Sequence, residues 1–193
     1  MNIPPLYVLR HGQTEWNAVH RLQGMLDSPL TAQGVAEAQH QNKILSHRDL
    51  ANFKAYSSPQ GRAVETARIA LNGLIADIQT DERLREIGVG AWQGRYVADL
   101  EIDRALDESD ESAFDLYERA PDGEGFQALK TRCVAFLDDL TGPSIVVTHG
   151  ITSRMLRLIL LDMDISEIGL LPGGQGVAYY LEQGVQIKLT IGA

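Results

Sequence analysis

The amino-acid sequence predicts an α/β fold, a three-layer α/β/α sandwich in which helices lie on both faces of a mostly parallel central sheet. The first observation is that short strand-like runs alternate with longer helical patterns along the chain. The second is that two of these runs, 6–9 and 144–147, consist of residues typical of buried strands. The third is the length of 193 residues, which can bury a sizeable core and predicts one domain, 1–193.

The strands are predicted from short apolar or β-branched runs. We expect them at 6–10, 53–58, 78–84 and 144–150, followed by two C-terminal strands within 176–191 that are joined by a turn at Gln183-Gly184. Parallel strands need crossover connections, and each of the first four runs is separated from the next by enough residues for one. The C-terminal pair is instead expected to be a hairpin.

The helices are predicted from apolar periodicity and capping residues. The first follows Thr31, which can act as its N-cap, and ends near 47. The second covers 61–71, with Pro59 near its start, where a missing N–H group does no harm. Two more are expected at 128–140 and 152–161. Cys133 falls on the apolar face of the helix at 128–140, so we interpret it as a core thiol.

Composition excludes several classes of function. The net charge of −9 and the pI near 5.0 predict an acidic surface, which repels nucleic acid and anionic membranes, so we expect neither as a partner. The longest apolar runs, such as 156–161, are too short to span a bilayer, and no secretory signal is visible. A single cysteine excludes an internal disulfide and fits a reducing compartment. We therefore predict a cytoplasmic protein, with a homodimer left open.

One stretch, at about 95–122, differs from the rest of the chain. Between residues 95 and 120 it holds nine acidic residues against three arginines and few apolar residues. We predict a lid-like insertion of short surface helices. A solvated face is the alternative, and the charges alone do not separate the two.

Two of the predicted strands are followed by a histidine and a glycine. His11 follows the strand at 6–10, and His149-Gly150 ends the strand at 144–150. Since the carboxyl ends of parallel strands meet at one edge of a sheet, where ligands bind in such folds, both histidines are expected in a shared site. A glycine beside each histidine allows a ligand to approach the backbone closely.

The residues near these histidines favour an anionic ligand. Arg10 can hold two oxygens of an anion with its guanidinium fork. Arg62 begins the helix after another strand, and helix N-termini also favour anions. Asn17 adds a neutral donor. Together these groups predict a pocket for a dianion such as phosphate. A metal site is the rival, but His20, His40 and His47 lack ligand spacing and paired cysteines are absent, so no metal is expected.

Six segments in order resemble the histidine phosphatase superfamily, that is the phosphoglycerate mutase-like branch 1 with its RHG motif. They are RHGQTEWN, PLTAQG, SSPQGRAVETA, LREIGVGAWQG, PDGEG and VVTHG. The resemblance implies a phosphohistidine intermediate on His11, with Glu86 as proton donor and no cofactor or metal. It further implies that the phosphoryl group is held by Arg10, Arg62 and His149 with Gly150, and that Gln13, Asn17, Gln23 and Gly24 complete the pocket.

The chemistry of phosphoryl transfer fits these residue types. Negative charge accumulates on the phosphoryl oxygens in the transition state, where fixed cations stabilise it. A histidine nucleophile must be neutral at the attacking nitrogen, so its other nitrogen is expected to donate a hydrogen bond, for instance to a backbone carbonyl. A carboxylic acid can protonate the leaving alkoxide, and the resulting carboxylate can activate water.

The acidic insertion favours hydrolysis over mutase chemistry. A mutase must retain a bisphosphate, for which family mutases place extra cations after the acid residue, whereas this stretch is acidic and lacks lysine. We predict a phosphomonoester hydrolase for a small phosphorylated metabolite, with α-ribazole phosphate and sugar phosphates as candidates. The alternatives are a cofactor-dependent phosphoglycerate mutase and a catalytically silent module that binds phosphate ligands. Two departures from the family bear on specificity: Gly125 in place of a serine, and the segment GGQG at 173–176.

Overall fold

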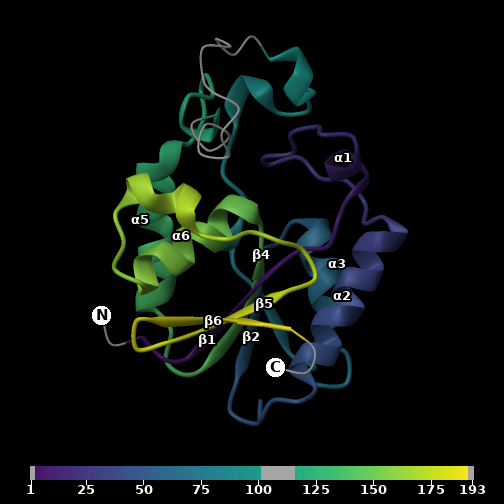
Figure 1. The fold of residues 1–193 in the computed structure, drawn as a ribbon, viewed down its shortest axis with the longest axis vertical. Helices are drawn as coiled ribbons and strands as arrows, with labels where there is room; N and C mark the ends of the chain where they lie inside the picture. Colours follow the sequence, from purple (N-terminus) through teal and green to yellow (C-terminus); the bar gives the residue numbers. More distant parts are fainter. Residues whose placement is uncertain (1–2, 101–115, 191–193) are drawn as a thin grey trace.

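The computed structural model describes residues 3–100 and 116–190, which form a six-stranded mixed sheet with helices around it (Figure 1). The strand order is β3-β2-β4-β1-β5-β6. The strands are β1 (Leu6–Arg10), β2 (Lys54–Ser57), β3 (Ile78–Thr80), β4 (Ser144–Thr148), β5 (Ala178–Glu182) and β6 (Val185–Leu189). The first four are parallel, and the C-terminal hairpin adds two antiparallel strands beside β1. The mostly parallel sheet predicted from the sequence is confirmed.

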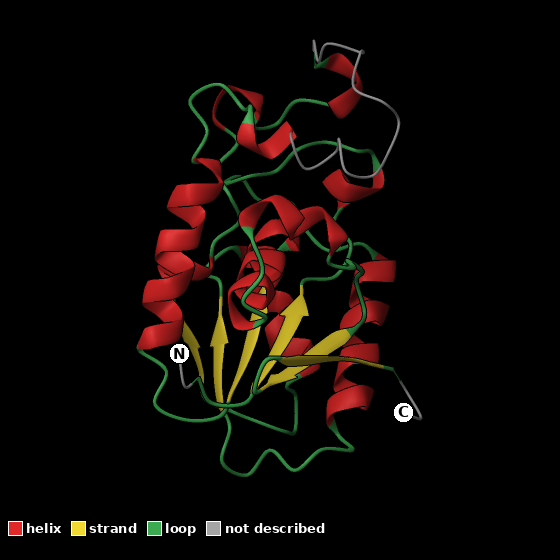
Figure 2. Cartoon of the chain, turned by 60° about the vertical axis from the view of Figure 1, so that its left-hand side comes forward, coloured by secondary structure: helices red, strands yellow, loops and turns green. Residues whose placement is uncertain are grey.

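Helices lie on both faces of this sheet (Figures 1 and 2). On one face are α2 (Ala32–Leu45) and α3 (Gly61–Ala70), and on the other are α5 (Gly125–Asp138) and α6 (Gly150–Leu160). Shorter helices are α1 (Glu15–Ala18) and the 3₁₀ segments Glu82–Leu84, Gly90–Trp92, Val97–Asp99 and Ile165–Leu170. The three-layer architecture agrees with the sequence prediction.

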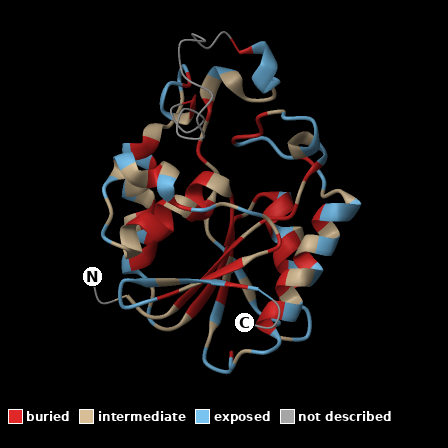
Figure 3. Cartoon of the chain, viewed as in Figure 1, coloured by how far each residue is buried: buried red, intermediate tan, exposed pale blue. Residues whose placement is uncertain are grey.

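The alternation of side chains along the strands builds two separate cores. In β1, Leu6 and Val8 pack with α5 and α6, whereas Tyr7 and Leu9 pack with α2 and α3. All five residues of β4 are buried, as expected for a strand in the middle of a sheet. Figure 3 shows the central strands as the buried interior between helices that are exposed on their outer sides. These cores fix the positions at which β1 and β4 end.

The structure agrees with the predicted cap of α2 but shortens two of the predicted strands. Thr31 caps α2 by accepting a hydrogen bond from Gly34 N. The predicted strand at 78–84 was too long, because it ends at Thr80 and Asp81 then caps a 3₁₀ turn. The predicted strand at 144–150 was also too long, because it ends at Thr148, His149 is the N-cap of α6 and Gly150 is the first residue of that helix. Pro59 directly precedes Gln60, the N-cap of α3, and so lies near the start of that helix as predicted.

Cys133 lies in the core on α5, as the apolar face of that helix predicted. Burial raises the pKa of its thiol to about 12, so the thiol stays protonated at neutral pH. It therefore carries no reactive chemistry in the folded protein.

The described ends of the acidic stretch are attached to the main body of the fold. Val97 N donates to His20 O, and Gly88 and Glu124 exchange two hydrogen bonds. The lid predicted between these ends falls on residues 101–115, which lie outside the described residues; they include Glu101, Asp103, Arg104, Asp107, Glu108, Asp110, Glu111 and Asp115. In the described parts of the chain, no helix has the length and apolar character needed to cross a membrane.

Candidate active site

His11 and His149 meet at the carboxyl edge of the sheet. Arg10 pairs with Thr148 at the ends of the parallel strands β1 and β4, and His11 N donates to Thr148 O at 2.9 Å. The two imidazole rings are buried and their centroids lie 5.1 Å apart, edge to face. The structure therefore brings together the two histidines for which the sequence predicted a shared site.

The ring of His11 is held in one tautomer. Its Nδ1 lies 2.7 Å from Gly12 O. A carbonyl oxygen can only accept, so Nδ1 carries the proton and Nε2 keeps a lone pair. Burial, reinforced by the charges of Arg10 and Arg62, holds the pKa of His11 well below its usual range. The imidazole is therefore neutral at physiological pH and available as a nucleophile through Nε2.

The glycine after His11 allows α2 to pack closely against the chain at the end of β1. The sequence suggested that Gly12 keeps the path of a ligand clear. In the structure a Cβ at Gly12 would lie 2.2 Å from Gly34 O on α2, so the glycine allows α2 to approach the end of β1. Gly12 N donates to Thr66 Oγ1 on α3. Both contacts fix the peptide whose carbonyl orients His11.

His149 is engaged by protein groups at both ring nitrogens. Arg62 Nε donates to its Nδ1 at 3.2 Å, which leaves the proton on Nε2, and Nε2 donates to Ser58 Oγ at 2.7 Å. Burial, followed by the charges of Arg62, His11 and Arg10, holds the pKa of His149 well below its usual range. The resemblance implied a direct phosphoryl contact, but in this structure His149 orients Arg62 and Ser58.

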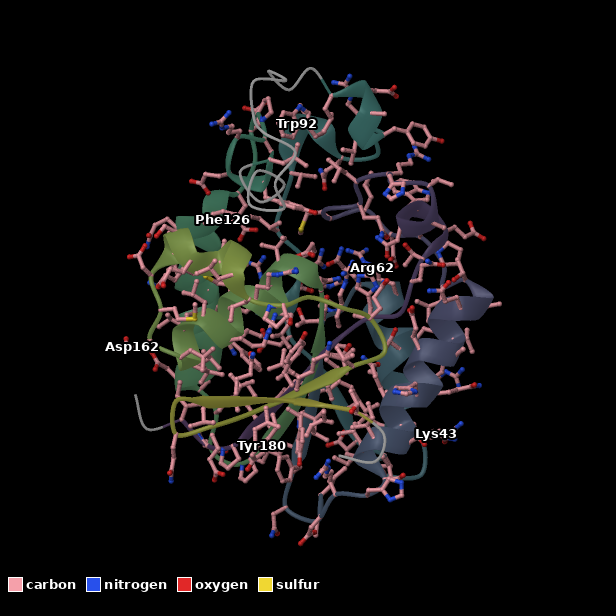
Figure 4. The ribbon with its side chains drawn as sticks, viewed as in Figure 1. Lys43, Arg62, Trp92, Phe126, Asp162 and Tyr180 are labelled. Atoms are coloured by element: carbon pink, nitrogen blue, oxygen red, sulfur yellow. The ribbon has the colours of Figure 1, made fainter. Side chains whose placement is uncertain are left out.

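Arg62 lies at the start of α3, above the sheet (Figure 4), and its side chain is buried. Besides the bond to His149, Nη1 donates to Leu26 O at 2.7 Å and to Asp27 Oδ1 at 3.0 Å, and Nη2 donates to Gly24 O at 3.0 Å. These contacts use all the N–H groups of the guanidinium except one on Nη2. The cation is thus fixed in place and keeps one donor for a ligand.

Arg10 and Glu86 converge on Gly150, the first residue of α6. A Cβ at Gly150 would lie 3.5 Å from Arg10 Cζ and 3.5 Å from Glu86 Oε2. Both are ordinary van der Waals distances, so Arg10 and Glu86 both pack against the start of α6. Arg10 Nε is buried and has no hydrogen-bond partner among the described residues. A donor without a partner beside His11 is suited to an anionic ligand.

The carboxylate of Glu86 is surrounded by hydrogen-bond donors. Ile151 N donates to Oε2 at 3.1 Å, and Thr152 N donates to Oε1 at 3.1 Å. Thr152 Oγ1 lies 3.0 Å from Oε1 but only 2.7 Å from Arg85 O, which takes its single proton. The two N–H groups belong to the first turn of α6, where the helix dipole also favours a negative charge. The carboxyl group of Glu86 is therefore held at the start of α6.

Of the other residues predicted to line the pocket, Asn17 lies in α1 and Gln23 and Gly24 lie in the loop after it, whereas Gln13 contacts α2. Asn17 Oδ1 accepts from Thr14 N, and Gln23 Nε2 donates to Thr14 Oγ1, which fixes the loop that also carries Gly24. Gln13 instead faces α2: its N donates to Glu37 Oε2, and its Oε1 accepts from Thr31 Oγ1. The prediction that the backbone of Gln13 lines the pocket is therefore not met in this structure.

Sequence reasoning missed four polar residues that orient the site, namely Asp27, Ser58, Gln60 and Thr152. Gln60 joins two parts of the site, because its Nε2 donates to Gly24 O and its Oε1 accepts from Glu86 N. The position of Ser58 directly after β2, at the same edge as the histidines, was a usable signal. No pattern in the sequence indicated the other three. Within the described residues, no group of three or more His, Cys, Asp and Glu side chains could hold a metal ion.

The two buried histidines predict a loss of stability at mildly acidic pH. The unfolded chain takes up protons on these residues below about pH 6.5, whereas the folded imidazoles resist protonation, so the unfolded state binds more protons. The free energy of unfolding should therefore fall with decreasing pH, by up to about 1.4 kcal/mol per pH unit for each histidine.

Urea unfolding at pH 7.5, 6.5 and 5.5 measures this dependence. His11→Gln should lower the slope of the free energy of unfolding against pH by about 1.4 kcal/mol per pH unit, which corresponds to one proton. His47→Gln serves as the matched control, since His47 is exposed in the folded chain, and should leave the slope unchanged. Equal slopes for wild type and His11→Gln would contradict the prediction.

Nearly the whole chain is similar to one known protein family. The family model of the histidine phosphatase superfamily (branch 1) matches residues 6–183, which include both histidines and both arginines of the site. The chain belongs to this superfamily. A resemblance based on six short segments is thereby extended to nearly the whole chain, and the fold agrees with it.

Relatives of this chain carry two kinds of name. A probable phosphoglycerate mutase, GpmB, of Enterobacter sp. (strain 638) is 38% identical over 168 residues, which cover 82% of this chain and 75% of the relative. The solved structure of a putative alpha-ribazole-5'-P phosphatase from Escherichia coli has a TM-score of 0.79 and 27% identity, covering 100% of this chain and 97% of the other. A mycobacterial glucosyl-3-phosphoglycerate phosphatase has a TM-score of 0.77 and 29% identity, covering 92% of each chain.

Proposed function

We propose that this histidine phosphatase is a metal-independent phosphomonoester hydrolase that transfers the phosphoryl group through His11. The observation that carries the proposal is the buried, neutral imidazole of His11, whose Nδ1 is fixed by Gly12 O while Nε2 keeps its lone pair beside two arginines. A fixed neutral nucleophile next to fixed cations is the arrangement that phosphoryl transfer requires.

In the first step, Nε2 of His11 attacks phosphorus and the bond from phosphorus to the leaving oxygen breaks. Arg10 and the remaining Nη2 donor of Arg62 stabilise the charge on the phosphoryl oxygens, and the amide of Asn17 contributes a neutral donor. The departing oxygen takes a proton from Glu86, which must enter the step as the acid. The N–H groups of Ile87, Ile151 and Thr152 hold this carboxyl group in position for the step.

In the second step, water attacks phosphorus and the bond to Nε2 breaks, which returns His11 to its neutral form. The carboxylate of Glu86 takes the proton from the attacking water, so that acid and base functions alternate on one group. The hydrogen bonds from α6 support this half of the cycle, since they stabilise the ionised form that must act as base. No step needs a metal.

Hydrolysis and mutase chemistry share the first step and differ in what accepts the phosphoryl group. The acidic composition of 95–120 supports water as the acceptor, because nine acidic residues against three arginines would repel a retained bisphosphate. The names of the structural relatives support hydrolysis, whereas the GpmB name supports a mutase. We infer a small phosphorylated metabolite as substrate, with α-ribazole phosphate or a sugar phosphate as candidates.

The test is release of inorganic phosphate from a panel of phosphomonoesters in the presence of EDTA. The panel contains an aryl phosphate, sugar phosphates, 3-phosphoglycerate and α-ribazole phosphate. We expect release from at least one ester, at a rate that chelation does not change. Loss of activity in EDTA would contradict a metal-independent reaction. Interconversion of phosphoglycerates without phosphate release would show a mutase, and binding without any turnover would show a silent module.

A further inference from the structure

The loop 171–177, which contains the GGQG segment, is held in place by side chains beneath it. Arg154 Nε donates to Leu171 O at 2.9 Å, and Arg157 Nη2 donates to Pro172 O at 2.9 Å. Tyr179 Oη also lies within hydrogen-bond distance of two carbonyls of this loop, Pro172 O and Gly173 O. Three side chains from α6 and β5 thus fix the first half of the loop.

These contacts extend deep into the protein. Arg157 is buried, and its guanidinium lies 4.0 Å from the centroid of the Tyr179 ring. Burial lowers the pKa of Arg157 to about 10, so it keeps its charge at neutral pH. A buried cation needs polar partners, and those of Arg157 are Pro172 O of the loop, Ser153 O and Gln186 Oε1. The loop is therefore part of the folded framework and can position a side chain accurately.

The loop also lies very close to its neighbours, which its glycines permit. A Cβ at Gly173 would lie 2.3 Å from Arg154 Nη2, and a Cβ at Gly176 would lie 3.3 Å from Glu37 Cγ on α2. The glycines therefore let the loop run between α6 and α2. Gln175 is carried on this loop to the candidate active site, where its Nε2 lies 3.3 Å from Asn17 Oδ1.

Two donors, Thr14 N and Gln175 Nε2, hold the oxygen of the Asn17 amide. Thr14 N is an obligatory donor, and it lies 3.2 Å from the same Asn17 oxygen, so this atom is the amide oxygen. With Oδ1 held by two donors, Nδ2 of Asn17 points away from both of them. The donor side of the amide is thereby left for another acceptor.

We propose that Gln175 is a positioning residue, which holds the Asn17 amide so that its N–H groups face the phosphoryl oxygens. This proposal rests on the proposed function for the role of Asn17. The segment GGQG, a departure from the family pattern, then has a defined purpose: the glycines admit the loop and the glutamine supplies the donor. When the Gln175 donor is lost, Thr14 N alone among the described residues holds the Asn17 oxygen, so the amide is held less firmly and its N–H groups face the anion less often.

Affinity for inorganic phosphate, measured by titration calorimetry, tests the proposal without relying on turnover. Gln175→Ala should weaken phosphate binding about 3- to 10-fold, the worth of one hydrogen bond. Gln175→Glu should weaken it more, because a carboxylate attracts the Asn17 N–H groups away from the anion. The matched control is Gln79→Ala on the edge strand β3, where the side chain is exposed, and it should leave the affinity unchanged.

Two further measurements separate positioning from a general effect on the loop. In an Asn17→Ala background, Gln175→Ala should cause no additional loss of affinity, because its target is gone. Gln175→Glu should regain affinity relative to wild type as the pH falls below about 4.3, where a protonated glutamate can donate again. An equal loss in the presence and absence of Asn17, or equal affinity for Gln175→Ala and Gln79→Ala, would overturn the proposal. A protein that binds phosphate as expected but hydrolyses no ester would contradict the proposed function alone.

Discussion

Replacement of His11 by alanine is expected to lower kcat for the best phosphomonoester by about 10⁴-fold or more, the cost of removing a covalent nucleophile. His149 cannot take over, because Arg62 Nε occupies its Nδ1 and its Nε2 donates to Ser58 Oγ. The measurement is phosphate release in single and multiple turnover. Wild type that is incubated with labelled ester and quenched with denaturant at alkaline pH should in addition retain label that is stable in base and labile in acid, as expected of a phosphoramidate.

The control for this experiment is His47→Ala, which removes an exposed histidine after the end of α2 and should leave kcat unchanged. A His11→Ala protein that binds phosphate and still releases it from an ester at more than about 1% of the wild-type rate would exclude a phosphohistidine at this position. Labelling of a residue other than His11 in the wild type would lead to the same conclusion.

The centre of the sheet could be predicted from sequence because β1 and β4 carry apolar runs and clear helical patterns separate the strands. Burial on both faces makes the middle of β4, residues 145–147, apolar, and β1 and β4 end opposite each other at Arg10 and Thr148. The shared site of His11 and His149 follows directly from that register. The end of β3 was not predictable in this way, since the side chain of Asp81 starts a turn by accepting from Arg83 N.

The orientation of the site residues could not be predicted, because it depends on partners that are distant in the sequence. Arg62 is fixed by the loop at 24–27 and by His149, and neither leaves a mark on the residues around Arg62. Gln13 follows the RHG segment directly, yet Glu37 and Thr31 turn it toward α2. Residue type and spacing thus predicted which groups gather at the sheet edge, whereas the hydrogen bonds decide which atoms face a ligand.

The departure at Gly125 has a local structural explanation. Gly125 adopts a φ of +73°, a conformation that other residues rarely take, and the next N–H group, on Phe126, donates to Glu118 Oε2 at 2.5 Å. A carboxylate from the end of the acidic stretch therefore satisfies a donor at the start of α5. The serine hydroxyl of the family pattern is not needed for this purpose here.

Arg62→Met should destabilise the protein by about 2–4 kcal/mol, in addition to removing a cation from the site. Methionine keeps an apolar stem but has no donor, so most of the loss comes from acceptors that are left without a partner. These acceptors are Gly24 O, Leu26 O, Asp27 Oδ1 and His149 Nδ1. The free energy of unfolding in urea measures the effect.

A second variant shows which of these acceptors matters most. The Asp27 side chain is 42% exposed, so water can solvate it when its partner is lost, and Asp27→Asn should cost less than about 1 kcal/mol. The buried carbonyl of Gly24 and the ring of His149 have no such compensation, and they should account for most of the loss in Arg62→Met. If Asp27→Asn destabilised the protein as much as Arg62→Met, the ion pair would be the main contribution, and the neutral acceptors would contribute little. If Arg62→Met costs more stability than Asp27→Asn, as expected, the main structural role of Arg62 is to hold the loop at 24–27 against His149. Its remaining donor is available to the ligand because the others are already bound.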